Sequence, residues 1–178
     1  PRDARYGAGM SLDTIAIFDV PIPLEPTTLV GRLSADPALA ALVPRFGREW
    51  EVSEWSVQPS TSDSRVVDLV GPGGIVLRLG RRSVEVYHLL RFSAFAAGGE
   101  DHDVVRRAFR AIARIVGSRR AVYTHELAPA DRDPDEGVDA VIANLTAAVG
   151  PASTTFAELA GAQNYRSGSW YVDTFPEL

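Results

Sequence analysis

The sequence lacks two residue types that carry much of protein chemistry, cysteine and lysine. It contains no cysteine, and all 18 of its basic side chains are arginine. Without cysteine there is no disulfide, no thiol nucleophile and no cysteine-ligated metal site. Without lysine there is no Schiff-base lysine, no phosphate-binding P-loop lysine and no Ser-Lys dyad. The two absences therefore exclude several large classes of enzyme and metal-binding protein.

Two explanations fit the absence of lysine. Arginine and alanine have GC-rich codons and lysine does not, so a GC-rich genome accounts for it most simply. The alternative is selection for the planar guanidinium group, which binds carboxylates and phosphates through two parallel hydrogen bonds. The sequence alone leaves both explanations open, and the lack of cysteine leaves the redox compartment undetermined.

Length and charge predict a single acidic domain. A chain of 178 residues with 46% hydrophobic content can bury one core. Residues 1–9 show no periodicity, so we interpret them as a tag or disordered extension, and residues 10–178 as the domain. The net charge of -5 argues against a nucleic-acid or anionic-membrane partner. We expect a cytoplasmic location, because no apolar run resembles a signal or a membrane span.

Hydrophobic periodicity predicts an α+β fold with a mainly antiparallel sheet. Glycine-rich turns at 71–74 and 80–82 separate runs of alternating polarity, which is typical of a meander. Helical patterns precede and follow this block, so we expect the helices to pack on one face of the sheet. The predicted strands are 12–22, 50–57, 65–70, 75–79, 83–95, 121–128 and 169–175. The predicted helices are two within 26–46, one at 101–116, one at 138–149 and a short one from 155.

The helix at 101–116 has the strongest pattern. Its apolar stripe leaves four arginines on the opposite side, at three- and four-residue intervals. This arginine ridge consists of Arg106, Arg107, Arg110 and Arg114. No acid lies between Val104 and Arg120, so the helix cannot neutralise the ridge by internal pairs.

The ridge has three interpretations. It is a solvated face, a docking surface for carboxylates or phosphates of a partner, or one side of internal ion pairs with Asp131, Asp133, Asp135 or Asp139. Its position opposite the buried stripe predicts that replacing Arg106, Arg110 and Arg114 with glutamine leaves the fold intact.

An acidic loop precedes the helix at 138–149. Its acids, Asp131, Asp133, Asp135 and Glu136, suggest a calcium-binding loop at first. The spacing rules this out, because the glycine is seventh and the twelfth position is Ile142. We interpret the loop as complementing the helix dipole, and as a second candidate surface for a protein partner.

Histidines and tryptophans form the other candidate site. His88 and His125 lie on predicted strands, and on neighbouring strands they could bind a metal or act as acid and base. Glu126 follows His125 and therefore points to the opposite face. Trp50, Trp55 and Trp170 could line a pocket with these groups. The alternative is that all are core residues, with His102 solvated at a helix start, and we expect no metal and no cofactor.

These patterns favour a binding protein over an enzyme. No Gly-x-Ser-x-Gly elbow and no triad context is present. Our hypothesis is a non-catalytic bacterial protein-binding module, by analogy with immunity proteins that neutralise a toxin by occlusion. The alternative is a small-ligand-binding protein or enzyme that uses His88 and His125 in a pocket on the sheet.

Overall fold

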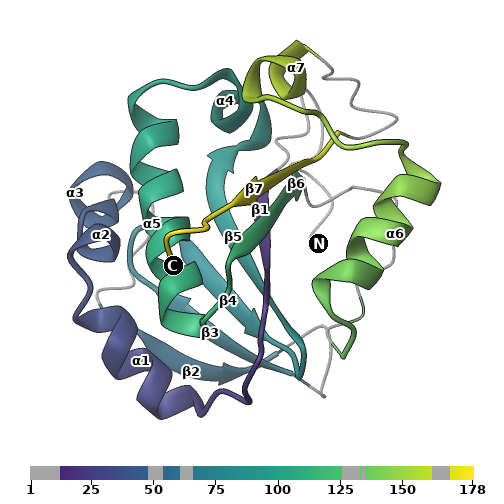
Figure 1. Cartoon of the computed structure of the whole chain (residues 1–178). Helices are drawn as coiled ribbons and strands as arrows, with labels where there is room; N and C mark the ends of the chain where they lie inside the picture. Colours follow the sequence, from purple (N-terminus) through teal and green to yellow (C-terminus); the bar gives the residue numbers. More distant parts are fainter. Residues whose placement is uncertain (1–12, 48–53, 61–65, 126–132, 134, 162–168) are drawn as a thin grey trace, which may run out of the picture.

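The computed structural model describes residues 13–47, 54–60, 66–125, 133, 135–161 and 169–178 (Figure 1). The strands are β1 (Asp13–Asp19), β2 (Ser56–Pro59), β3 (Val67–Gly71), β4 (Ile75–Leu79), β5 (Ser83–Arg91), β6 (Arg120–His125) and β7 (Tyr171–Thr174). The helices are α1 (Pro26–Ser34), α2 (Pro37–Ala40), α3 (Leu42–Phe46), α4 (Phe92–Ala97), α5 (Glu100–Val116), α6 (Val138–Ala148) and α7 (Phe156–Gly161). No helix of these ranges is long and apolar enough to cross a membrane.

The strands form one antiparallel sheet in the order β2-β3-β4-β5-β1-β6-β7. Successive hairpins connect β2 to β5, so the predicted meander is present, and the predicted α+β class is confirmed. The first strand of the chain, β1, lies at the centre, between β5 and β6. Helices fill the two connections that flank it, α1 to α3 after β1, and α4 and α5 after β5.

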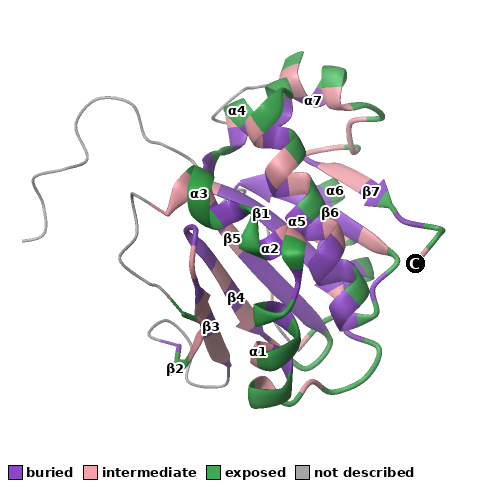
Figure 2. Ribbon diagram, turned by 90° about the vertical axis from the view of Figure 1, so that its left-hand side faces the viewer, coloured by how far each residue is buried: buried purple, intermediate pink, exposed green. Residues whose placement is uncertain are grey.

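Most helices cover one face of the sheet. Ala16 and Phe18 of β1 point to this face, where Phe18 contacts Phe109 of α5 edge to face at 6.4 Å. The main core also contains buried residues of α1, α2, α4 and α7. Figure 2 shows the buried strands behind the exposed outer sides of these helices. This layer is the one that the sequence predicted.

The second face is covered by α6, and only in part. Ile15 and Ile17 of β1 and Val122 of β6 pack against α6 residues Val138, Val141 and Leu145. A second layer is needed over β1 because five consecutive residues of this strand are buried, and successive side chains point to opposite faces of the sheet. In β4, by contrast, buried and half-buried residues alternate. Figure 1 shows α6 on the side of the sheet opposite α5.

The largest local difference from prediction is the end of β5. The predicted strand 83–95 ends at Arg91, and Phe92–Ala97 form the helix α4. Phe92, Phe95 and Ala96 are buried. Residues three and four positions apart lie on the same face of a helix, so this spacing suits α4. Asp36 caps the start of α2, and Gly117 adopts the left-handed conformation after α5.

Candidate functional site

Three of the four ridge arginines form ion pairs inside the molecule. Arg106 donates two hydrogen bonds to Asp173 of β7, from Nε at 2.8 Å and from Nη2 at 3.0 Å. Arg110 pairs with Glu177, and Arg114 pairs with Asp36. Internal pairing was one of the three interpretations, but for these arginines the partners come from β7, the C-terminal residues and the α2 cap instead of the acidic loop.

The Arg106 pair is the most buried of these. The side chain of Asp173 is 6% exposed, and it also accepts a hydrogen bond from the buried Tyr123 hydroxyl at 3.3 Å. The guanidinium of Arg106 lies over the ring of Phe156, 5.2 Å from its centroid. The hydrogen bonds to Asp173 raise the pKa of Arg106, so its guanidinium stays charged. Arg106 therefore connects α5 to β7.

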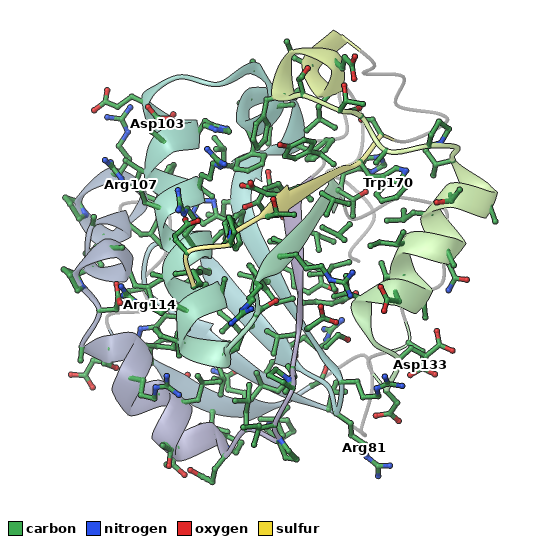
Figure 3. The ribbon with its side chains drawn as sticks, viewed as in Figure 1. Arg81, Asp103, Arg107, Arg114, Asp133 and Trp170 are labelled. Carbon is green, nitrogen blue, oxygen red and sulfur yellow. The ribbon has the colours of Figure 1, made fainter. Side chains whose placement is uncertain are left out.

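Arg107 differs from its neighbours. It is exposed and forms no ion pair with any carboxylate that the structure describes. Figure 3 shows Arg107 close to Asp103, one turn earlier on the outer side of α5, and Arg114 farther along the same helix. Of the ridge, Arg107 is the residue that remains open to a partner, so the ridge as a whole is a weak candidate for the contact surface.

Asp36 links two structural roles, and this gives a prediction. Its carboxylate caps α2 by accepting the Ala38 N–H at 2.9 Å, and it also receives Arg114. We expect Asp36→Ala to lower the free energy of unfolding by about 1–2 kcal/mol, the usual effect of a lost helix cap. Urea titration followed by circular dichroism measures it. Asp36→Asn keeps the cap and should lose less; equal losses in both variants would contradict this account.

The acidic loop is described only in part. Asp131 lies outside the described residues, and Glu136 is exposed. Asp133 accepts a hydrogen bond from the Asp135 N–H at 2.9 Å, and Asp135 lies 3.8 Å from Arg81. Figure 3 shows Arg81 and Asp133 at the same end of the molecule.

Asp139, another of the predicted acidic partners, pairs with Arg120, which lies outside the ridge. Arg120 binds Asp139 at 2.8 Å and Asp19 at 2.7 Å. Asp19 also accepts the Val138 N–H at 3.2 Å, at the first turn of α6. These contacts attach α6 to β1 and β6, so their role is structural.

His88 and His125 are not on neighbouring strands. β1 lies between β5 and β6, and Thr14 pairs with both histidines. Their backbones are thus two strand spacings apart, about 10 Å. Among the described residues, no group of three or more histidines and acids could hold a metal ion. Glu126 lies outside the described residues. The hypothesis of a joint site for the two histidines is therefore not supported by the strand order.

Both ring nitrogens of His88 are bonded to backbone groups. Nδ1 accepts the Leu90 N–H at 3.0 Å, so Nε2 carries the proton and donates to the Gly73 carbonyl at 3.1 Å. Burial lowers the pKa of His88 to about 4. His88 is thus a neutral, hydrogen-bonded core residue, which was the alternative interpretation.

The bonds of His88 stabilise a bulge in β5. Asp13 pairs with Arg91 but the next residue, Thr14, pairs with His88, so Leu89 and Leu90 have no partner on β1. His88 satisfies the N–H of Leu90, and the Thr14 hydroxyl donates to its carbonyl at 2.6 Å. Two side chains thereby replace the ladder bonds that the bulge removes.

The other two histidines also lie in the core. His125 is 3% exposed, and its ring is 5.6 Å from that of Phe92. His102 is buried, with Nδ1 2.6 Å from the Phe95 carbonyl and its ring against Phe95 and Phe156. The expectation of a solvated His102 is wrong, because α4 and α7 cover the first turn of α5.

Trp55 and Trp170 do not line a common pocket. Trp55 packs over Gly71, where an added Cβ would lie 2.6 Å from the indole ring, and it belongs to the main core. Trp170 belongs to the cluster under α6 and donates to the Gly150 carbonyl at 2.9 Å. These two side chains lie on opposite faces of the sheet. Trp50 lies outside the described residues.

A pocket of about 200 Å³ opens at the β5 bulge. We call it the Asp13 pocket, and it is lined by Asp13, Gly74, Val76, Arg78, Tyr87, His88 and Leu89. Asp13 is half-buried, and burial raises its pKa. Its carboxylate forms no hydrogen bond or ion pair with any residue that the structure describes. Bulges often re-aim side chains next to binding sites, which makes this pocket the candidate site.

A charged network borders the pocket. Arg78 donates from Nε to Asp68 at 3.1 Å and from Nη1 to the Tyr87 hydroxyl at 3.2 Å. Tyr87 in turn donates to Glu85. These residues sit opposite one another on β3, β4 and β5, in the pairs Asp68 with Arg78 and Arg78 with Glu85. The hairpin turns set this register. Asp68, Arg78 and Glu85 place one charge on each of three successive strands, with the sign alternating from strand to strand. The network could have been predicted from this pattern in the sequence.

The sequence comparisons add no relative to this picture. No protein-family model and no curated protein matches the chain.

Proposed function

We propose that this chain is a non-catalytic protein-binding domain that contacts its partner through the part of the second sheet face that no described helix covers. We call this part the open sheet face, and it consists of the half-buried residues Asp68, Val70, Val76, Arg78, Tyr87 and Leu89, of which Tyr87 also packs against the cluster under α6. The observation that carries the proposal is the position of the Asp13 pocket within this face. A sheet face with a pocket among its residues suits a protein partner that inserts one side chain.

The packing of the helices supports this choice of face. Of the described helices, α6 is the one whose buried residues pack on the second face, against β1 and β6. The open sheet face, on β3 to β5, mixes apolar and aromatic residues with charged ones. Such a mixture is typical of non-obligate protein interfaces, whose centre is apolar and whose rim is polar. The ridge on α5, by contrast, uses most of its charges internally.

The test is reconstitution with the proteins encoded beside this gene. We expect one of them to form a stoichiometric complex, measured by size-exclusion chromatography and calorimetry. The double variant Val76→Glu, Leu89→Glu should weaken the complex at least about tenfold, because it places charge at the apolar centre of the interface. Ile22→Glu is the matched control, since Ile22 is 70% exposed between β1 and α1. A complex that survives the double variant, or the absence of any complex, would contradict the proposal.

An inhibitor that occludes the active site of a toxin is one form that this function would take. It predicts that the complex loses the partner's enzymatic activity, and that the Val76→Glu, Leu89→Glu variant restores it. A partner that keeps its activity in the complex would exclude occlusion while leaving the binding function in place.

The Asp13 pocket also favours a second candidate function, the binding of a free small ligand. His88 cannot supply its chemistry in the described state, because both ring nitrogens are bonded to the backbone. Asp13, Arg78 and Tyr87 are the groups that could contact such a ligand.

A further inference from the structure

We infer that the Asp13 pocket binds an organic cation, a guanidinium or alkylammonium group, and that under the proposed function this group is an arginine or lysine side chain of the partner. The inference rests on the proposed function for the source of the cation only. The preference of the pocket for a cation follows from the pairing of its charged groups, because Arg78 already has a carboxylate partner and Asp13 has none among the described residues.

The guanidinium of Arg78 is largely committed. Three of its nitrogens donate, two of them to Asp68 and one to Tyr87, out of five N–H groups that an arginine offers. The Tyr87 hydroxyl in turn donates a hydrogen bond to Glu85, which is 5% exposed. Arg78 is therefore neutralised by the carboxylates beside it and has little capacity to attract an anion.

Asp13 has no such partner among the residues that the structure describes. It lines the same pocket as Arg78, yet no ion pair joins the two. Arg78, the arginine that lines the pocket, already donates to Asp68, so the carboxylate of Asp13 is the charged group of the lining that has no partner among the described residues. Apolar walls from Val76 and Leu89 strengthen the field of this carboxylate, because they lower the local dielectric. A half-buried carboxylate without a partner is stabilised by an incoming cation.

The size of the pocket limits the occupant. At about 200 Å³ it is smaller than the roughly 300–1,000 Å³ typical of drug-sized ligands. It suits the end of one side chain, or a small amine of similar size.

Arg91 provides an internal competitor. It pairs with Asp13 across the strands, so the two side chains lie on the same face, but no ion pair forms between them and Arg91 is exposed. Removing its charge should leave Asp13 more open to an external cation. The inference therefore makes opposite predictions for the two members of one cross-strand pair.

The experiment titrates the chain alone with n-butylguanidinium, and follows the amide signals of Gly74 and Leu89 by NMR. We expect a dissociation constant of about a millimolar. Asp13→Asn should weaken binding about tenfold, because a hydrogen bond to a charged group is lost. Arg91→Gln should tighten it by about two- to fivefold. Neutral n-butylurea and anionic butanoate, which share the butyl group, are the ligand controls.

Each result decides the question. Butylurea binding as tightly as butylguanidinium would overturn the inference, as would tight binding of butanoate or an unchanged affinity in Asp13→Asn. If Asp13→Asn does not fold, Arg91→Gln and the three ligands still decide. Because no partner protein is used, cation binding by a chain that forms no complex would support the pocket chemistry while contradicting the proposed function.

Discussion

Arg106→Gln will lower the free energy of unfolding by about 1.5–3 kcal/mol, the usual contribution of hydrogen bonds to a charged group. The reason is that Asp173 is 4% exposed and would lose both hydrogen bonds from Arg106, which leaves the Tyr123 hydroxyl as its described side-chain donor. Urea titration followed by circular dichroism gives the value. The other ridge residues should differ, because Arg110 pairs with an exposed glutamate and Arg107 has no described ion-pair partner.

The controls follow from that difference. Arg110→Gln should cost at most about 1 kcal/mol and Arg107→Gln less than about 0.5 kcal/mol. The double variant Arg106→Gln, Asp173→Asn should recover part of the loss, because the unpaired charge is gone. Equal losses of unfolding free energy at all three arginines would show that the Arg106–Asp173 pair stabilises the fold no more than the exposed positions do. Our sequence-based prediction, that replacing Arg106, Arg110 and Arg114 with glutamine leaves the fold intact, stays a prediction, and the ion pairs add to it an expected loss of stability.

His88→Asn will flatten the pH dependence of stability between about pH 6.5 and pH 4. Burial lowers the pKa of His88 to about 4 in the folded chain, against about 6.5 when unfolded. In this window the unfolded chain binds a proton at His88 that the folded chain does not bind. The stability that neutral His88 contributes is therefore fully present above about pH 6.5 and is lost as the pH falls, by about 3 kcal/mol in total.

The same variant has a second effect at neutral pH. The amide oxygen of asparagine can still accept the Leu90 N–H, but the bond to the Gly73 carbonyl is lost. We expect a loss of about 1–3 kcal/mol at about pH 7. Urea midpoints measured at several pH values for both proteins test both effects. The account is wrong if the wild-type and variant stabilities fall in parallel as the medium is acidified.

Some features of this fold were predictable from the sequence because residues close together in the chain determine them. The glycine turns of the meander, the capping by Asp36 and the stripe of α5 each depend on neighbours within a few positions. The end of β5 was not predictable in this way, because the spacing of Phe92 and Phe95 is compatible with a helix and with a strand. Only the packing of α4 against α5 and α7 decides between them.

The partners of the ridge were beyond local reasoning. Arg106 and Asp173 are separated by 67 residues, and Arg114 and Asp36 by 78. The nearer acids of the 131–136 loop were the natural guess from sequence. The Asp13 pocket depends on a strand pairing of the same long-range kind, between the start of β1 and the bulge of β5.

The central position of β1 has a consequence for how the chain folds. This strand is made before its neighbours β5 and β6, because Thr14 and Leu90 are 76 positions apart and Asp19 and Ser118 are 99 positions apart. During synthesis, its run of buried residues must wait until β6 has left the ribosome. Pairing over such separations slows folding and leaves an apolar strand exposed to other chains. We therefore expect yield during expression to depend on temperature and on chaperones more than on the stability of the finished fold.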